Sequence, residues 1–174
     1  TFSLIHAKNN LKGITILDFC CGTSSILEHF DLHNNNQIYS ITGVDISKEY
    51  LDFAKAKYFP ILGYQSFTDA GIRLDFVQHD AVNYLHKEKA DAIICSSAYH
   101  HIEDERKLLF LANVKKHLKN EGIAVFCENF IRDFNNQESY FAATIEFYDA
   151  RIRELIEMGI TDVRLQLLER VKQY

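Results

Sequence analysis

The chain has 174 residues, of which 47% are hydrophobic and 25% charged, a composition that suits one globular domain. The formal net charge is −5 and no Lys/Arg cluster forms a face, which argues against a nucleic-acid partner held by its phosphates. No apolar run reaches the ~20 residues of a membrane span, and no signal peptide opens the chain. Four cysteines without CxxC spacing predict neither disulfides nor a zinc site, and a reducing cytoplasm suits them.

Short apolar runs alternate with longer amphipathic segments, and this alternation predicts βαβ units on a parallel sheet. Residues 14–19 form the first expected strand, and residues 24–30 the helix after it. A second strand is expected at 38–44. Ser47 then caps a helix whose apolar residues are spaced for one face, namely Tyr50, Leu51, Phe53, Ala54 and Tyr58.

The second half of the chain continues the alternation after a loop at 59–72 that is rich in glycine and aromatic residues. Strands are expected at 74–77 and at 90–95. A strongly amphipathic helix is predicted over 103–118. Its apolar residues are expected to face inward, namely Leu108, Leu109, Leu111, Ala112 and Leu118.

The last third of the chain begins with a turn at 120–122 and a fifth strand at 123–127. Residues 137–174 are expected to be helical, with Gly159 ending one helix. A strand at 163–167 is the competing interpretation, because apolar and polar residues alternate there. The richness of the segment in Leu, Gln, Glu, Arg and Lys favours a helix.

Polar residues follow the predicted strands at their carboxyl ends, where open parallel sheets bind ligands. The first strand runs into Asp18 and Gly22, and a glycine there lets a ligand approach the backbone and the next helix start. Asp45 ends the second strand, about 25 residues on, which is the spacing of a ribose-binding acid. Asp80 follows the third strand, where it can accept a hydrogen bond from an adenine amino group. Together these residues supply sites for an amino-acid end, a sugar and a base.

These segments resemble the class I S-adenosylmethionine (SAM)-dependent methyltransferases of the small-molecule type over residues 14–129. The segments that carry the resemblance are 16–23 (first motif), 41–46 (acidic loop), 76–80 (adenine segment), 91–102 (fourth motif) and 117–126 (the turn before the fifth strand). Each motif alone is weak, but five in order at the family's spacing are specific.

The resemblance implies the residues that would hold the cofactor. Those for the methionine end are Asp18, Cys20, Gly22 and Thr23, with Ser96 beside them. Those for the adenosine are Asp45 at the ribose, Ile46 packed on the adenine, and Asp80 and the Ala81 amide at its edge. Cys20 and Ser24 stand where the family usually has glycines.

The resemblance also implies the fold, a Rossmann-like three-layer αβα sandwich with a mainly parallel sheet in the order 3-2-1-4-5 and C-terminal helices. We expect residues 1–174 to be a single SAM-binding domain, with a core at 14–129 and a helical lid or insertion at 130–174. Both ends look cut, so the family's last antiparallel strands are expected to be missing.

His100 and His101 follow the fourth strand and are the candidates for a catalytic base. A histidine has a pKa near neutrality, so it can take a proton from a hydroxyl or amine as the methyl group leaves sulfur. The alternative is that one packs against Ser96 or a backbone carbonyl and the other is exposed. A metal site that adds Glu103 is conceivable, but adjacent histidines rarely converge on one ion, and we predict no metal.

The predicted reaction is methyl transfer from SAM, leaving S-adenosylhomocysteine (SAH), to an oxygen, nitrogen or carbon of a small molecule. One alternative is a methyltransferase acting on protein or RNA, which a basic surface would favour. Another is a non-catalytic, methyltransferase-like subunit completed by a partner, which the altered glycines keep open. A homo-oligomer and a partner subunit both stay open.

Overall fold

The computed structural model describes residues 13–30, 32, 37–60 and 72–160. They divide into two compact units, one ending at Glu128 and the other beginning at Asn129. Most of the loop expected at 59–72, and the segment at 163–167 where helix and strand compete, lie outside the described residues. Within the described residues, no helix is both long and apolar enough to cross a membrane.

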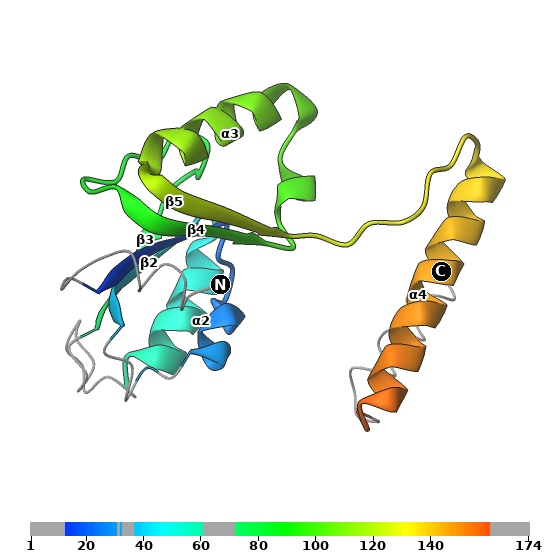
Figure 1. Ribbon diagram of the computed structural model, residues 1–174. Coiled ribbons are helices and arrows are strands. Elements are labelled where there is room, and N and C mark those ends of the chain that lie inside the picture. Colours follow the sequence, from blue (N-terminus) through cyan, green and yellow to red (C-terminus); the bar gives the residue numbers. More distant parts are fainter. Residues whose placement is uncertain (1–12, 31, 33–36, 61–71, 161–174) are drawn as a thin grey trace. The chain divides into compact units, whose positions relative to one another are not determined.

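The described part of the first unit holds a five-stranded parallel sheet in the order β3-β2-β1-β4-β5 (Figure 1). The strands are β1 (Ile14–Phe19), β2 (Ile38–Asp45), β3 (Arg73–Gln78), β4 (Ala90–Ser96) and β5 (Leu118–Cys127). This arrangement confirms the predicted order 3-2-1-4-5. Strand order reverses between β1 and β4, and the carboxyl ends of these two strands flank the crevice where such sheets bind ligands.

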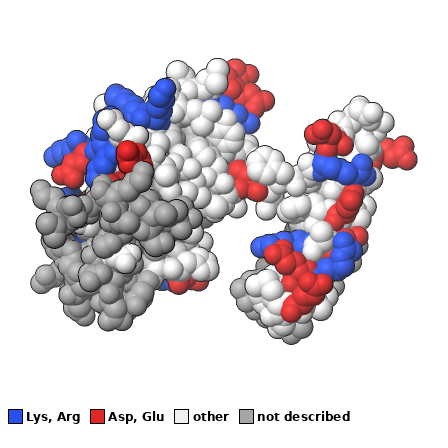
Figure 2. Space-filling model, in the orientation of Figure 1, with Lys and Arg blue, Asp and Glu red and all other residues white. Residues whose placement is uncertain are grey.

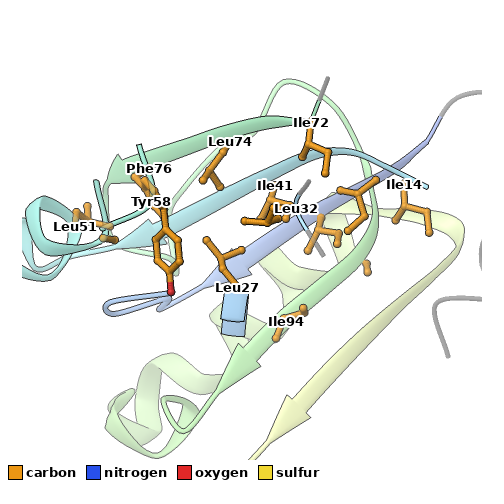
Figure 3. Packing of buried hydrophobic residues seen from close by; sticks show 14 residues of the cluster. Ile14, Leu27, Leu32, Ile41, Leu51, Tyr58, Ile72, Leu74, Phe76 and Ile94 are labelled. Atoms are coloured by element: carbon orange, nitrogen blue, oxygen red, sulfur yellow. The ribbon is translucent and has the colours of Figure 1, made fainter. Parts of the chain in front are cut away.

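Helices α2 (Lys48–Tyr58) and α3 (Asp104–His117) cover opposite faces of the sheet, which confirms the three-layer prediction (Figure 1). Strand β1 is buried along its whole length, and its alternating side chains divide between the two faces. Ile16 belongs to the apolar cluster under α2, drawn in Figure 3, and Phe19 to the cluster under α3. This central strand therefore holds both helices in place, and with them the loops that carry polar residues.

Helix α2 begins as the sequence predicts, because the Ser47 hydroxyl accepts a hydrogen bond from the Tyr50 amide at 3.3 Å. Its buried stripe is narrower than predicted. The buried residues are Leu51, Ala54 and Tyr58, whereas Tyr50 and Phe53 are more than half exposed. The spacing of the buried three matches one side of a helical wheel, which leaves the other two aromatic rings to the solvent side.

Helix α3 buries a different face from the one predicted. Leu108 and Leu109 are 78% and 60% exposed. The buried side chains are Phe110, Asn113, Val114 and His117. The two polar members are hydrogen-bonded to the loop after β3, which compensates for removing them from water. The hydropathy pattern therefore indicated the wrong side of this helix.

Two local expectations also differ from the structure. The segment expected as a helix at 24–30 is a short 3-10 helix, η1 (Ser25–His29), preceded by a left-handed Ser24 that an α-helix cannot include. The turn expected at 120–122 lies inside β5. Ala90 pairs with Leu118 and Ala92 with Ile123, so the residues between form a bulge in the strand.

The second unit is built around helix α4 (Gln137–Glu157). Asn136 and Ser139 form a capping box at its start, each side chain accepting a hydrogen bond from the other's amide. Gly159, with a φ of +74°, ends the helix as predicted, and the Ile160 amide bonds back to the Leu155 carbonyl. The single-domain arrangement and the lid role of this segment stay predictions.

Candidate functional site

A cleft of about 530 Å³ lies at the carboxyl ends of the strands. The predicted cofactor residues that line it are Cys20, Gly22, Thr23, Asp45, Ile46, Asp80, Ala81 and Ser96. Asp18 lies in an adjoining cavity of about 200 Å³, which shares Cys20, Cys21, Ser25, Ser96 and Ser97 with the cleft. Residues far apart in the sequence are thus brought to one place, at the edge of the sheet where the strand order reverses.

The loop after β1 adopts an alternating backbone. Cys20, Gly22 and Ser24 have φ angles of +57°, +54° and +54°, in the left-handed region that side chains disfavour by about 1–2 kcal/mol. The two non-glycine members are the positions where the resembled family has glycine. A Cβ built on Gly22 contacts nothing within 4 Å, so the space beside this backbone is open. The buried Ser24 hydroxyl has no hydrogen-bond partner among the described residues. This loop therefore offers a close approach to its backbone.

Asp45 ties that loop to the start of α2. One carboxylate oxygen accepts the Gly22 amide at 2.7 Å, and the other accepts the Ser47 amide at 2.8 Å. The side chain is nearly buried, at the end of β2. A carboxylate offers about four lone-pair positions, so both oxygens can still accept from a ligand hydroxyl.

Asp18 is a buried acid at the end of β1, with 3% of its surface exposed. Burial, and secondarily the charge of Asp45, raise the pKa of Asp18 to about 7. A cation placed in the adjoining cavity would favour the ionised form, because the carboxylate then gains an opposite charge. The site is suited to an ammonium group at this end.

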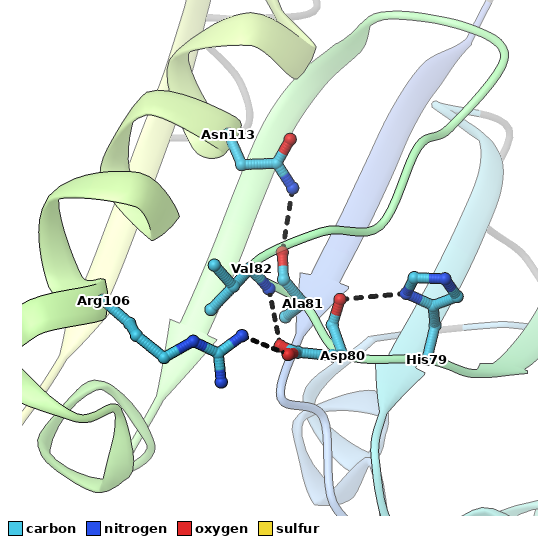
Figure 4. Close-up of polar contacts among 6 residues, drawn as sticks. All are labelled: His79, Asp80, Ala81, Val82, Arg106 and Asn113. Atoms are coloured by element: carbon cyan, nitrogen blue, oxygen red, sulfur yellow. Dashed lines mark hydrogen bonds and ion pairs between the residues drawn. The ribbon is translucent and has the colours of Figure 1, made fainter.

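The loop after β3 is held by α3 (Figure 4). The Asn113 side-chain amide donates to the Ala81 carbonyl at 2.8 Å and to the Tyr84 carbonyl at 3.0 Å. Asp80 accepts the Val82 amide at 2.9 Å and forms an ion pair with Arg106. Burial opposes ionisation of Asp80, but the bonds from Arg106 and Val82 outweigh it and lower the pKa of this carboxyl. The acid is therefore charged and oriented at the cleft wall.

The loop after β4 is held by Glu128. Its carboxylate accepts the Ala98 and Tyr99 amides at 2.9 and 2.7 Å and contacts His100 Nδ1 at 2.7 Å. These bonds fix the start of the 3-10 helix η2 (Tyr99–His101). His101 lines the cleft, whereas His100 is absent from the cleft lining and lies against the His101 ring, with centroids 3.9 Å apart. The structure thus separates the two candidate bases by position.

Several cleft residues are not among the predicted site residues, including Tyr50, Ser97, Ile102 and Arg106, and the sequence suggests Glu103 only as a conceivable metal ligand. Tyr50 lies one turn after the cap residue and Arg106 in the first turn of α3, positions that a search for basic or aromatic residues at helix starts could have found. The charged lining consists of Asp45, Asp80, Glu103 and Arg106, so acids predominate and favour a cationic ligand. Among the described residues, no three His, Cys, Asp or Glu side chains converge to hold a metal ion.

Residues 16–122 match the family described as methyltransferase domain. The carboxy-S-adenosyl-L-methionine synthase of Wolinella succinogenes is 27% identical over 122 residues, covering 70% of this chain and 47% of that protein. An uncharacterized methyltransferase of Schizosaccharomyces pombe is 31% identical over 94 residues, covering 53% of this chain and 31% of that protein. The chain thus spans about half or less of these relatives.

Two solved structures share the fold. A SAM-dependent methyltransferase from Clostridium acetobutylicum has a TM-score of 0.57 and 24% identity, covering 78% of this chain and 55% of that one. An amino pentose methyltransferase from Micromonospora echinaspora, bound to SAM, has a TM-score of 0.54 and 20% identity, covering 77% of this chain and 51% of that one.

Proposed function

This chain belongs to the methyltransferase domain family of SAM-dependent enzymes, and on that premise we propose that it transfers a methyl group from SAM to an oxygen, nitrogen or carbon of a small molecule. One observation carries the proposal. The strand-end residues Gly22, Asp45 and Asp80 line one cleft at the reversal of strand order, where an adenosyl ligand has a backbone, a ribose acceptor and a base acceptor within reach.

The residues present fit SAM in shape and charge. The open side of Gly22 leaves room for the ligand beside the left-handed loop, and Asp18 in the adjoining cavity suits its ammonium group. Asp45 would accept from the ribose hydroxyls, and Asp80 with the Ala81 amide would bind the edge of the adenine. Ile46, 71% exposed at the cleft, gains burial when a planar base covers it. Bound SAM supplies an electrophilic methyl group on a sulfonium centre.

The chain's own part in the reaction is to orient two reactants and to take up a proton. His101 lines the cleft and is the better placed of the two candidate bases. His100, held on Glu128 through Nδ1, packs on the His101 ring and limits its motion. Glu128 acts on the cleft through the two amides that it fixes in η2. Orientation of this kind accounts for much of the rate in a simple group transfer.

A small-molecule acceptor is supported by the neighbours' own names, which include an amino pentose methyltransferase and a plantazolicin methyltransferase. A protein or RNA acceptor is the alternative. Figure 2 shows basic side chains gathered at one edge of the first unit with acidic ones beside them, which suits an extended polyanion poorly. A non-catalytic subunit is the other alternative. Cofactor turnover, rather than cofactor binding, distinguishes it from an enzyme.

The first test is calorimetric titration of the chain with SAM and SAH. The variant Asp45→Asn removes an acceptor that the ribose needs, and loss of a hydrogen bond to a charged group weakens binding about 10- to 150-fold. The matched control is Asp52→Asn, an exposed acid on α2 that pairs with Lys48 outside the cleft. Because Asp45 also holds the loop, Ile46→Ala gives a second variant whose exposed side chain is not needed for folding.

Micromolar binding that both cleft variants weaken and Asp52→Asn retains supports the proposal. The control for Ile46→Ala is Ile156→Ala, which truncates an exposed isoleucine of α4. Failure of the folded wild-type chain to bind either ligand would overturn the assignment of the cleft. Circular dichroism of each variant establishes that a lost affinity is not a lost fold.

A further inference from the structure

An ion pair lies at the base end of the cleft. The Arg106 guanidinium contacts the Asp80 carboxylate, and both residues line the cleft (Figure 4). Their side chains are 37% and 29% exposed, so the ion pair is partly exposed to solvent and is not part of the buried core. Arg106 is the basic residue among the charged side chains of this wall, and neither a ribose nor a neutral base requires it there.

The loop that carries Asp80 does not need Arg106 to keep its shape. The Val82 amide bonds to the other carboxylate oxygen and closes a turn around Asp80. Asn113, buried on α3, donates to the carbonyls of Ala81 and Tyr84. These contacts are independent of Arg106, so its removal changes the charge at the cleft wall while leaving the loop held.

A second carboxylate lies just before the first turn of α3. Glu103 lines the cleft, is exposed, and accepts the Arg106 amide through its backbone carbonyl at 2.8 Å. Glu103 is the N-cap residue, three positions before Arg106. The hydrogen bond and charge of Asp80, and secondarily the negative charge of Glu103, raise the pKa of Arg106. A long arginine side chain has the freedom to reach Glu103. Arg106 therefore has one acidic partner, Asp80, and a second carboxylate close by at the cleft wall to which it can turn.

We propose that Arg106 is a specificity-determining residue that clasps Asp80 until a nucleobase amino group takes its place, and that it then turns to Glu103. The inference rests on the proposed function, in that the cleft binds an adenosyl ligand. Breaking the Arg106–Asp80 ion pair lowers the affinity for the ligand. The hydrogen bond from the base to Asp80 only replaces an interaction that Asp80 already makes in the free protein. A purine that lacks the 6-amino group cannot displace Arg106, since it offers Asp80 no proton at that edge.

The test is calorimetric titration of SAH into the wild-type chain and into Arg106→Met, which keeps an unbranched side-chain stem and removes the charged guanidinium. A partly exposed ion pair is worth little, so the variant should bind SAH about two- to fivefold more tightly. The matched control is Lys107→Met, which removes the same charge from the same helix but pairs with Asp104 outside the cleft. It should bind as the wild type does.

Three further measurements distinguish displacement of Arg106 by the base from a general effect of its charge. The gain of Arg106→Met should shrink between about 0.1 and 1 M salt, because the screening length falls from about 10 to 3 Å and weakens the competing pair in the wild type. The analogue of SAH that carries unsubstituted purine, without the 6-amino group, should gain nothing from the variant. Glu103→Gln removes the second carboxylate and should weaken SAH binding in the wild type but not in Arg106→Met.

Tighter binding of SAH alone, with Lys107→Met unchanged, supports the clasp. Equal or weaker binding by Arg106→Met overturns it, as does an equal gain for the purine analogue without the amino group. If neither the wild type nor the variant binds SAH, the proposed function fails instead. Binding by the variant alone would support both, since the pair then keeps the wild type below detection.

Discussion

At Gly22, the addition of one methyl group by Gly22→Ala should weaken cofactor binding while the protein still folds. Its φ of +54° is left-handed, and a Cβ built there meets no protein atom within 4 Å. Gly22→Ala therefore costs only backbone strain, about 1–2 kcal/mol. Gly159, with a φ of +74° and equally open surroundings, gives a matched substitution at the end of α4, at a position that is not part of the cleft lining.

The two alanine variants should differ in affinity for SAH. In Gly22→Ala the strain is present with and without ligand, so it cancels from the dissociation constant. The added methyl occupies space that the ligand would use, and overpacking costs about 1–3 kcal/mol, or about 5- to 150-fold in Kd. Gly159→Ala should bind as the wild type does. Calorimetry gives both constants, and thermal unfolding gives the strain.

Wild-type affinity in Gly22→Ala would refute the reasoning, because the ligand then does not approach this backbone. An equal loss in Gly159→Ala would refute it in another way, since a substitution at a left-handed glycine that does not line the cleft would then have the same effect. A loss confined to Gly22→Ala, with the secondary structure retained, is the expected result.

Three more predictions follow from buried polar groups. The pKa of Asp18 is raised from 3.8 to about 7, so the folded state holds a proton that the unfolded state releases. Stability should fall as pH rises from about 4 to 7 and level off above, and Asp18→Asn should remove this slope in denaturant titrations at each pH. Glu128→Ala leaves two amides without their acceptor and should lower the free energy of unfolding by about 1–3 kcal/mol, whereas Glu128→Gln retains an acceptor and should lose less. Asn113→Leu should weaken SAH binding as well as stability, because the Ala81 and Tyr84 carbonyls lose their donor; a loss of stability alone would show that the loop keeps its shape without it.

Much of the ligand-binding site at the carboxyl ends of the strands can be predicted from local sequence. Alternation of apolar runs with amphipathic segments predicts a parallel sheet. In such a sheet the residues that follow the strands all lie at the same end, beside the carboxyl ends of the strands. Asp45 and Asp80 are therefore expected to flank one crevice, and both line the cleft. Ser47 is a similar case, because an N-cap depends on a hydroxyl and an amide three residues apart.

The contacts that set the chemistry of the cleft needed the tertiary structure. Arg106 meets Asp80 across 26 residues, and Glu128 meets Tyr99 across 29, separations that no local pattern connects. His100 and His101 are chemically alike, and only their places on η2 distinguish the one in the cleft from the one on Glu128. The inward face of α3 shows the same limit. Hydropathy favours burial of the leucines, but Asn113 is buried because its side-chain amide donates to two carbonyls of a loop far away in the sequence. A sequence pattern reveals a hydrogen-bond partner only when that partner is close in the chain.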